Sequence, residues 1–168
     1  AGTRAVSLTI GGNDIGFSEI VQNCITWNPF SSPCRNRYIL NGVDTISQRI
    51  NATAPLVDAA LDGIRARSPL ARTFMVNYPA IFPETGYGCF PQMPVAFGDV
   101  GYLRNKQREL NQMVATQAAA NGARLVNWLQ DLSIDKGLMP TQEMAGKLGA
   151  SGLFTAGQGA MVTDGSWM

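Results

Sequence analysis

The positions of apolar residues along the 168-residue chain predict alternating strands and helices. Residues 5–10, AVSLTI, form a mostly apolar and partly β-branched run that predicts a strand. Further along, apolar residues recur at steps of three and four, which predicts an amphipathic helix. These residues are Val43, Ile46, Ile50, Ala54, Val57, Leu61 and Ile64. Pro55 lies inside this pattern and is expected to kink or split the helix.

A second strand and a second long helix follow. Residues 72–78, RTFMVNY, are almost continuously apolar, as is typical of a parallel strand covered on both faces. Residues 79–94 contain four prolines and predict a loop. The next helix is predicted to end at Asn121-Gly122, a common C-terminal signal. Its apolar positions are Val100, Leu103, Leu110 and Val114. Residues 123–127 predict a third strand or the start of another helix.

The remaining stretches are less regular. Residues 15–42 are expected to be irregular, with a short helix possible at residues 17–22. After about residue 125 the pattern predicts a mainly helical C-terminal segment, with a last strand and turn at residues 159–167. The alternation of strand and helix predicts an α/β fold with a parallel sheet. Sites in such sheets form outside the carboxyl ends of the strands.

Composition narrows the class of protein. Apolar residues make up 45% and charged residues 15% of the chain, as expected for a soluble globular protein. The net charge is +1 and no long basic run occurs, so nothing indicates nucleic acid or an anionic membrane as partner. No apolar run is long enough to predict a membrane span. No signal peptide precedes the first predicted strand, so we expect a processed chain or a piece of something longer.

The chain has no histidine and three cysteines. It therefore lacks the commonest general base and the commonest metal ligand, and we expect no metal and no cofactor. Cys24 and Cys34 lie ten apart in a stretch rich in Pro, Asn and Ser, which predicts a short disulfide loop; two free thiols are the alternative. A disulfide would imply an oxidising compartment. Cys89 is then left without a partner in this chain.

The first predicted strand ends in Gly11-Gly12-Asn13-Asp14. Two glycines allow a tight turn and a close approach to a ligand. The Asn13 side chain offers a neutral NH2 donor, as an oxyanion hole requires, and Asp14 could cap the next segment or brace the loop. The alternative is an ordinary strand-to-helix turn, because Gly, Asn and Asp are common in turns.

Residues 8–17, LTIGGNDIGF, resemble the third sequence block of the SGNH (GDSL-type) hydrolase family, whose signature is Gly-x-Asn-Asp. The secreted actinobacterial branch is more similar still, since its members carry the spacing of Cys24 and Cys34 and a tyrosine- and proline-rich loop like residues 76–90. The resemblance covers about residues 1–125. It implies a three-layer α/β/α fold, hydrolysis of carboxylic esters, lipids or acetylated sugars, and a secreted or cell-envelope location. It also implies that Asn13 lies in the oxyanion hole, with Gly11, Gly12 and Asp14 beside the substrate.

The chain departs from this family pattern in three places. It contains no Gly-Asp-Ser nucleophile block, since Asp164-Gly165-Ser166 has the wrong order and place. The block that supplies the oxyanion-hole glycine is missing, and so is the catalytic histidine. A Ser–Lys pair would be a substitute in principle. The candidates are Ser7, Ser18, Ser31, Ser32 and Ser47 with Lys106, Lys136 and Lys147. We therefore predict an inactive hydrolase fragment.

Residues 126–168 resemble a different family, the extracellular solute-binding proteins of sugar ABC transporters. This resemblance implies that Trp167 stacks on a sugar ring; a core or rim tryptophan is the alternative. We therefore predict a junction near residues 125–128 between two parts of different origin. Two further functions stay open. One is a carbohydrate-binding fragment, and the other is a structural module that self-associates through an exposed edge at residues 5–10. The residues that match the pattern of the solute-binding proteins are Leu153, Phe154, Gly157, Ala160, Met161, Gly165, Ser166 and Trp167.

Overall fold

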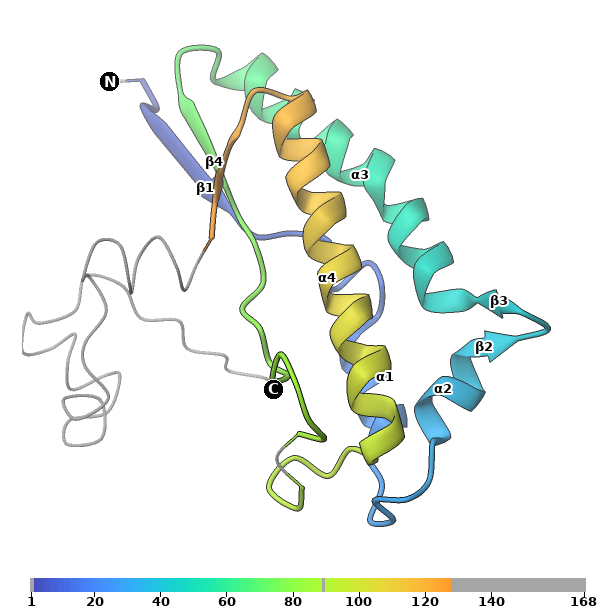
Figure 1. Ribbon diagram of the computed structural model, residues 1–168. Helices are drawn as coiled ribbons and strands as arrows, with labels where there is room; N and C mark the ends of the chain where they lie inside the picture. The colour runs from blue at the N-terminus through green and yellow to red at the C-terminus, as the bar shows by residue number, and fades with distance from the viewer. Residues whose placement is uncertain (1, 89, 128–168) are drawn as a thin grey trace, which may run out of the picture. The chain divides into compact units, whose positions relative to one another are not determined.

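The computed structural model describes residues 2–88 and 90–127. The predicted elements beyond residue 127 lie outside these residues. Strands and helices alternate along the chain, as the apolar pattern predicts (Figure 1). Their order is β1 (Ala5–Leu8), α1 (Phe17–Cys24), α2 (Pro33–Tyr38), β2 (Ile39–Leu40), β3 (Val43–Asp44), α3 (Thr45–Arg67), β4 (Arg72–Val76), α4 (Phe97–Ala120) and β5 (Arg124–Val126).

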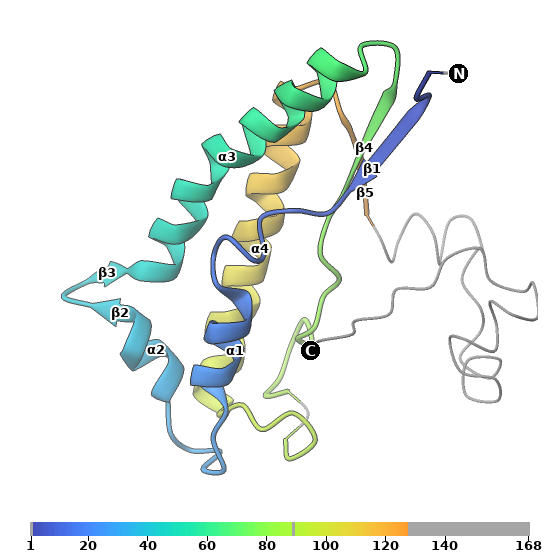
Figure 2. The same ribbon diagram turned by 180° about the vertical axis from the view of Figure 1, so that it is seen from behind.

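The main sheet has the order β1-β4-β5, and both strand pairs are parallel. Leu8, Met75 and Leu125 are register partners and therefore share one face of the sheet. Met75 is fully buried, and the other two side chains pack against the core. The long helices α3 and α4 lie on this side of the sheet in both views (Figures 1 and 2). The predicted α/β fold with a parallel sheet is confirmed.

The opposite face of the sheet carries Ser7, Phe74, Val76 and Val126. None of these side chains is fully buried. Among the described residues, the helices cover one face of the sheet (Figure 2). Helices were expected on both faces of β4, but among the described residues they lie on one face. The second helical layer of the three-layer α/β/α fold stays a prediction.

The α3 helix buries the apolar positions that the sequence predicts, but its first residue and the effect of Pro55 differ from the prediction. Its buried positions are Ile46, Ile50, Thr53, Val57 and Leu61. The helix begins at Thr45 because the Asp44 carboxylate accepts hydrogen bonds from the backbone N–H groups of Ile46 and Ser47, at 3.0 and 3.2 Å. Val43, expected in the helix, lies in β3. Pro55 does not split α3, because packing of the apolar face against α4 holds both halves in one helix.

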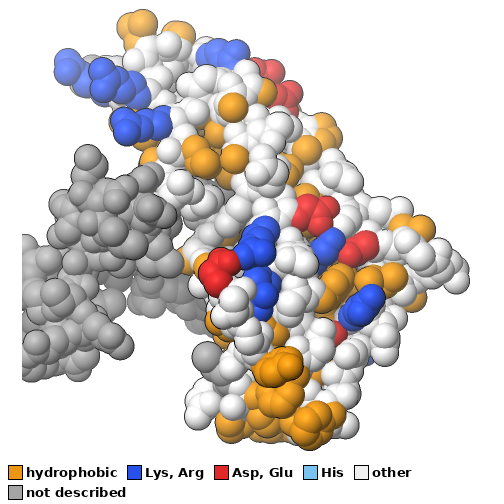
Figure 3. Space-filling view, viewed as in Figure 1, with side chains coloured by type: hydrophobic (Ala, Val, Ile, Leu, Met, Phe, Trp, Pro, Cys, Tyr) orange, Lys and Arg blue, Asp and Glu red, His pale blue; other side chains and the backbone are white. Residues whose placement is uncertain are grey.

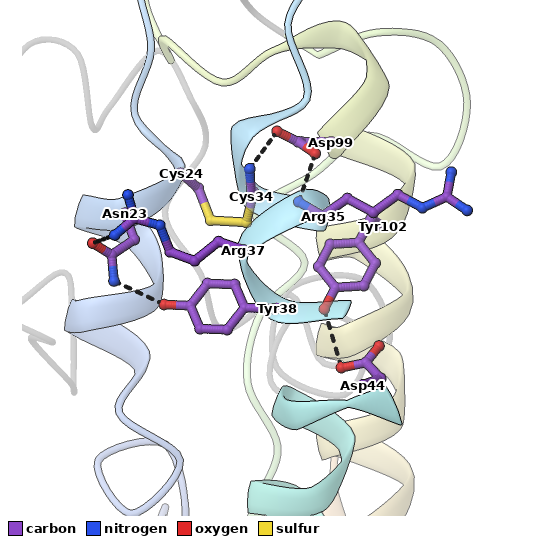
Figure 4. Close-up of a disulfide and its surroundings, with 9 residues drawn as sticks. All are labelled: Asn23, Cys24, Cys34, Arg35, Arg37, Tyr38, Asp44, Asp99 and Tyr102. Carbon is purple, nitrogen blue, oxygen red and sulfur yellow. Dashed lines mark hydrogen bonds between the residues drawn. A yellow bond between two sulfur atoms is a disulfide. The ribbon is translucent and has the colours of Figure 1, made fainter. Parts of the chain in front are cut away.

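Residues 15–42 were expected to be irregular apart from a possible short helix at residues 17–22. The α1 helix confirms the short helix, but the rest of the segment is more regular than expected. It contains α2 and the strand β2, which pairs with β3 through a turn where Asn41 and Gly42 have positive φ. The α2 helix is capped from a distance. The Asp99 carboxylate of α4 accepts hydrogen bonds from the backbone N–H groups of Cys34 and Arg35, each at 3.0 Å (Figure 4). A cap 65 residues away leaves no local sequence signal.

The predicted disulfide between Cys24 and Cys34 is confirmed (Figure 4). It joins the end of α1 to the start of α2, and both sulfur-bearing residues are fully buried. The Tyr38 ring lies beside it, and the Tyr38 hydroxyl accepts a hydrogen bond from Asn23 Nδ2 at 3.0 Å. Cys89 lies outside the described residues.

Candidate active site

The turn after β1 lies at the carboxyl end of the sheet, where sites of parallel sheets form. Gly11 has φ of 105°, a conformation that side-chain-bearing residues rarely adopt. The turn is closed by backbone hydrogen bonds from Ile15 to Gly11, from Gly16 to Asn13 and from Phe17 to Gly12, at 3.2, 2.9 and 3.0 Å. This closure leads directly into α1 and makes the turn a rigid platform.

Gly12 is needed for a close contact with Tyr78. Its backbone N–H donates a hydrogen bond to the Tyr78 hydroxyl at 2.8 Å. A Cβ atom on Gly12 would lie 2.8 Å from that hydroxyl oxygen, closer than real Cβ atoms approach, and 3.0 Å from Cζ of the ring, which is tighter than most real Cβ contacts. The second glycine therefore makes room for a tyrosine that comes from the end of β4.

Tyr78 is held in place from α4. Its backbone N–H donates to Asn111 Oδ1, and its carbonyl accepts from Asn111 Nδ2, both at 2.9 Å. Burial raises the pKa of the Tyr78 hydroxyl, the Asp14 charge raises it further, and the bond from Gly12 opposes these two effects only in part. Tyr78 therefore stays neutral at neutral pH. Sequence reasoning missed this residue, although its place in a tyrosine- and proline-rich segment after a strand was a signal.

Asn13 and Asp14 lie at the exposed tip of the turn. Among the described residues the Asn13 side chain has no hydrogen-bond partner, while its backbone carbonyl accepts from Gly16. The Asn13 amide can therefore donate to a ligand without breaking an internal bond. Gly11 and Gly12, by contrast, are buried beneath the tip.

Arg49 of α3 braces the turn from below. Its Nη1 donates to the Ile15 carbonyl at 3.2 Å and pairs with Glu19 Oε2 at 3.1 Å. Ile15 itself is buried in the core. The α1 helix has no side-chain cap at its N-terminus, so Asp14 does not have the capping role considered for it. The brace for the loop comes from a distant arginine.

One of the serine–lysine pairs open from the sequence is brought together. Lys106 Nζ donates to Ser47 Oγ at 2.5 Å and also contacts Asp44 Oδ2 at 2.9 Å and Glu109 Oε2 at 2.6 Å. Burial lowers the pKa of Lys106, but the hydrogen bonds to Glu109 and Asp44 outweigh burial and raise it on balance. A lysine that holds its proton so firmly cannot take one from a serine. The cluster instead ties the start of α3 to α4.

The described residues hold no group of three or more His, Cys, Asp or Glu side chains that could bind a metal ion. In the same part of the chain, no helix combines the length and the apolar character needed to cross a membrane. Trp167, the predicted sugar-stacking residue, lies outside the described residues, as do Lys136 and Lys147.

Curated relatives of the chain are lipases. "Lipase 2" of Streptomyces coelicolor is 41% identical over 133 residues, which cover 76% of this chain and 44% of that protein. A "Lipase" of Streptomyces rimosus is 34% identical over 122 residues, which cover 73% of this chain and 42% of that protein. The chain thus spans less than half the length of these relatives.

Two solved structures share the fold. The phospholipase A1 of Streptomyces albidoflavus NA297 matches with a TM-score of 0.64 and 24% identity, over 80% of this chain and 55% of that one. The extracellular lipase of Streptomyces rimosus matches with a TM-score of 0.51 and 26% identity, over 77% of this chain and 53% of that one. These likenesses agree with the parallel sheet and helices described above.

The family model described as "GDSL-like Lipase/Acylhydrolase family" matches residues 1–148. The match contains the whole Gly11–Asp14 turn and continues past the predicted junction near residues 125–128, whose existence stays a prediction. Both the sequence match and the relatives agree with the resemblance read from the Gly-x-Asn-Asp block. The chain therefore belongs to the GDSL-like lipase/acylhydrolase family.

Proposed function

We propose that this chain is part of an extracellular carboxylic-ester hydrolase and that Asn13 donates to the oxyanion formed from a small ester. The observation that supports this role is the exposed Asn13 amide on a turn fixed from both sides. One side is the Gly12–Tyr78 hydrogen bond, and the other is the Arg49 brace. Gly11 and Gly12 would lie beneath the bound ester, and Asp14 would lie at its side.

The chemistry of ester cleavage requires such a donor. When a nucleophile adds to the ester carbonyl, its oxygen gains negative charge in the tetrahedral intermediate. A neutral amide held in place beforehand stabilises this charge without reorganising during the reaction. Asn13 supplies that donor, while Tyr78 and Arg49 act as positioning residues because they hold the turn and not the substrate.

We also propose that the 168-residue chain does not hydrolyse esters alone. It contains neither a Gly-Asp-Ser segment nor a histidine. The Ser47–Lys106 pair is no substitute, because Glu109 and Asp44 keep the lysine protonated. Hydrolysis of p-nitrophenyl acetate and butyrate tests this point. We expect neither the wild-type chain nor the Asn13→Ala variant to exceed the rate without protein, and clear turnover by either would contradict the proposal.

A hybrid enzyme tests the role of Asn13 directly. The segment of the Streptomyces coelicolor Lipase 2 that matches this chain would be replaced by residues 1–126, so that the relative supplies the remaining parts. In an active hybrid, Asn13→Ala should lower kcat by about 10²–10³ with little change in KM. The control is Asn105→Ala, an exposed asparagine of α4 that should leave kcat unchanged. A folded hybrid whose kcat ignores Asn13→Ala would refute the role.

The disulfide supports the extracellular location. Cys24 and Cys34 are paired and buried, and such bonds persist in oxidising compartments. A similar solved structure is that of an extracellular lipase. We expect intact mass measurement, before and after reduction, to find this bond in protein collected from culture medium.

The alternative of a carbohydrate-binding fragment depends on Trp167 and its neighbours. Calorimetric titration with mono- and disaccharides tests it. Binding heat that disappears in Trp167→Ala would favour this alternative. No heat and no tryptophan quenching at millimolar sugar would exclude it.

The alternative of a self-associating structural module depends on the edge strand β1. In the sheet of the described residues β1 is an outer strand, and an unpaired edge can recruit another chain. Light scattering tests this alternative. A monodisperse monomer would argue against association through β1.

A further inference from the structure

Two loops, one between α1 and α2 and the other before α4, lie at one end of the described part of the chain. Aromatic side chains gather there. The Phe97 ring lies at the centre, with ring centroids of Tyr87 at 5.4 Å, Phe30 at 5.8 Å and Phe90 at 6.0 Å. Trp27 stands on the same loop as Phe30. We call these five residues the aromatic patch. Figure 3 shows hydrophobic side chains gathered at this end of the molecule.

Three of the five residues in the aromatic patch are strongly exposed, while Phe90 and Phe97 are half-buried beneath them. Phe30 is 87% exposed, Trp27 is 78% exposed and Tyr87 is 71% exposed. Single exposed apolar residues are normal, but a contiguous group of large rings marks an interaction surface. Rings that project this far into solvent are suited to insertion into the interface of a lipid bilayer.

The two loops that carry the aromatic patch are tied to each other. The Phe97 N–H donates to the Pro29 carbonyl and the Thr26 N–H donates to the Pro94 carbonyl, both at 2.8 Å. Ile25 and Val95 form an antiparallel bridge beside these bonds. The Cys24–Cys34 disulfide closes the base of the first loop. The surface is therefore formed before any partner arrives, which reduces the entropy cost of binding.

The chemistry of the two loops selects the partner. Residues 25–33 and 86–98 contain no charged side chain. The flanking charges are cationic, since Arg104 donates to the Gly86 carbonyl at 3.2 Å and Arg35 is exposed on α2. The nearby acids are engaged, because Asp99 is buried as the α2 cap and Glu84 pairs with Arg108. Uncharged aromatic rings with a rim of arginines match the interface of a phospholipid bilayer.

We propose that this chain docks onto phospholipid bilayers through the aromatic patch, with the rings at headgroup level and Arg35 and Arg104 facing the phosphates. Trp and Tyr suit this depth because each combines an apolar ring with a polar group. This docking goes beyond the proposed ester chemistry and does not require turnover.

Co-sedimentation of the 168-residue chain with phosphatidylcholine vesicles tests the proposal. We expect binding, and we expect Trp27→Ser with Phe30→Ser to lower the partition coefficient by about tenfold or more. The matched control is Leu70→Ser in the turn between α3 and β4, because Leu70 is 93% exposed but lies outside the aromatic patch. Unchanged melting by circular dichroism would show that the variants are folded.

Further arms separate docking from other uses of the aromatic patch. Adding phosphatidylglycerol should strengthen binding, and Arg35→Gln should reduce that gain more than Arg4→Gln at the start of β1. The proposal is overturned by a wild-type chain that ignores vesicles, or by a double variant that binds like wild type. It is also overturned if light scattering shows a dimer that Phe30→Ser dissociates while vesicles bind neither form. None of these results depends on whether the chain hydrolyses esters.

Discussion

At the scale of single residues, the contact between Gly12 and Tyr78 sets the geometry of the turn after β1. The Gly12 N–H donates to the Tyr78 hydroxyl. The Asn111 side-chain amide in turn accepts from the Tyr78 N–H and donates to the Tyr78 carbonyl. Because of this chain of contacts, the position of Asn13 depends on Tyr78, which follows β4, and on Asn111 of α4.

Gly12→Ala is expected to destabilise the chain by about 1–3 kcal/mol, because the new methyl group would collide with the Tyr78 hydroxyl. The control is Gly101→Ala in α4, where a Cβ meets nothing within 4 Å. That change should stabilise the helix by about 0.5–1 kcal/mol. Urea unfolding measures both free energies, and equal effects of the two substitutions would contradict the role of the Tyr78 contact.

At the scale of elements, two carboxylates fix the helices to one another. Asp44 caps the start of α3 and binds Lys106 and Tyr102 of α4. Asp99 reaches from α4 to the start of α2. Figure 4 shows both carboxylates beside the disulfide region, each linking two segments that lie far apart in the sequence. These polar contacts set how the helices meet, in addition to the apolar packing.

Asp99→Ala is expected to destabilise the chain by about 1–3 kcal/mol, because the buried N–H of Cys34 and the partly buried N–H of Arg35 lose their acceptor. Asp62→Ala is the comparison, since that exposed aspartate has only a 3.6 Å pair with Arg65 and should cost less than about 0.5 kcal/mol. Thermal melting under one set of conditions compares them. An Asp99 variant as stable as the Asp62 variant would rule out the long-range cap.

The Asp44–Lys106 pair predicts how stability depends on pH. Burial alone would raise the pKa of Asp44, but bonds from Lys106, Ser47 and Tyr102 lower it on balance. A lowered pKa means that the stabilisation is present above the unfolded value of about 3.9 and is lost as pH falls through the folded value. The raised pKa of Lys106 gives stabilisation that is present below about 10.4 and is lost as pH rises through the folded value.

Asp44→Asn should therefore flatten the acid side of a plot of unfolding free energy against pH. Asp62→Asn, at an exposed site, should leave that side as in the wild type. Urea unfolding from pH 2 to pH 7 gives both curves. An unchanged acid limb in Asp44→Asn would mean that the folded and unfolded chains bind the Asp44 proton equally well.

At the scale of the whole described unit, the sheet and the disulfide-bearing end differ in what stabilises them. The sheet and the helices α3 and α4 share a continuous apolar core. The loops that carry the aromatic patch contribute Val95 to that core, and they are also held by the disulfide and by backbone bonds between them. Among the described residues, the end with the exposed rings therefore has a covalent link in addition to the apolar packing that it shares with the sheet.

Replacing both cysteines by serine, Cys24→Ser with Cys34→Ser, should cost about 2–3 kcal/mol, as expected for a loop of this length. Circular dichroism should show unchanged helix content at room temperature and a lower melting temperature. Vesicle binding should also weaken, because the loop that holds Phe30 loses its closed base. Complete loss of helix content would show that the core depends on this bond.

The sequence by itself determined the long periodic elements and the turn at which we propose the site. Apolar spacing predicts α3 and α4, the short apolar runs predict β1 and β4, and Gly-x-Asn-Asp marks the turn at Asn13. These signals are local, since a helical or extended backbone places residues of fixed spacing on one face. Only the tertiary structure decided what lies between elements. It paired Gly12 with Tyr78, placed the Asp99 carboxylate at the start of α2, kept Lys106 protonated and brought Phe30 together with Tyr87, Phe90 and Phe97. Such contacts depend on atoms that folding brings together from distant positions, so no local pattern encodes them.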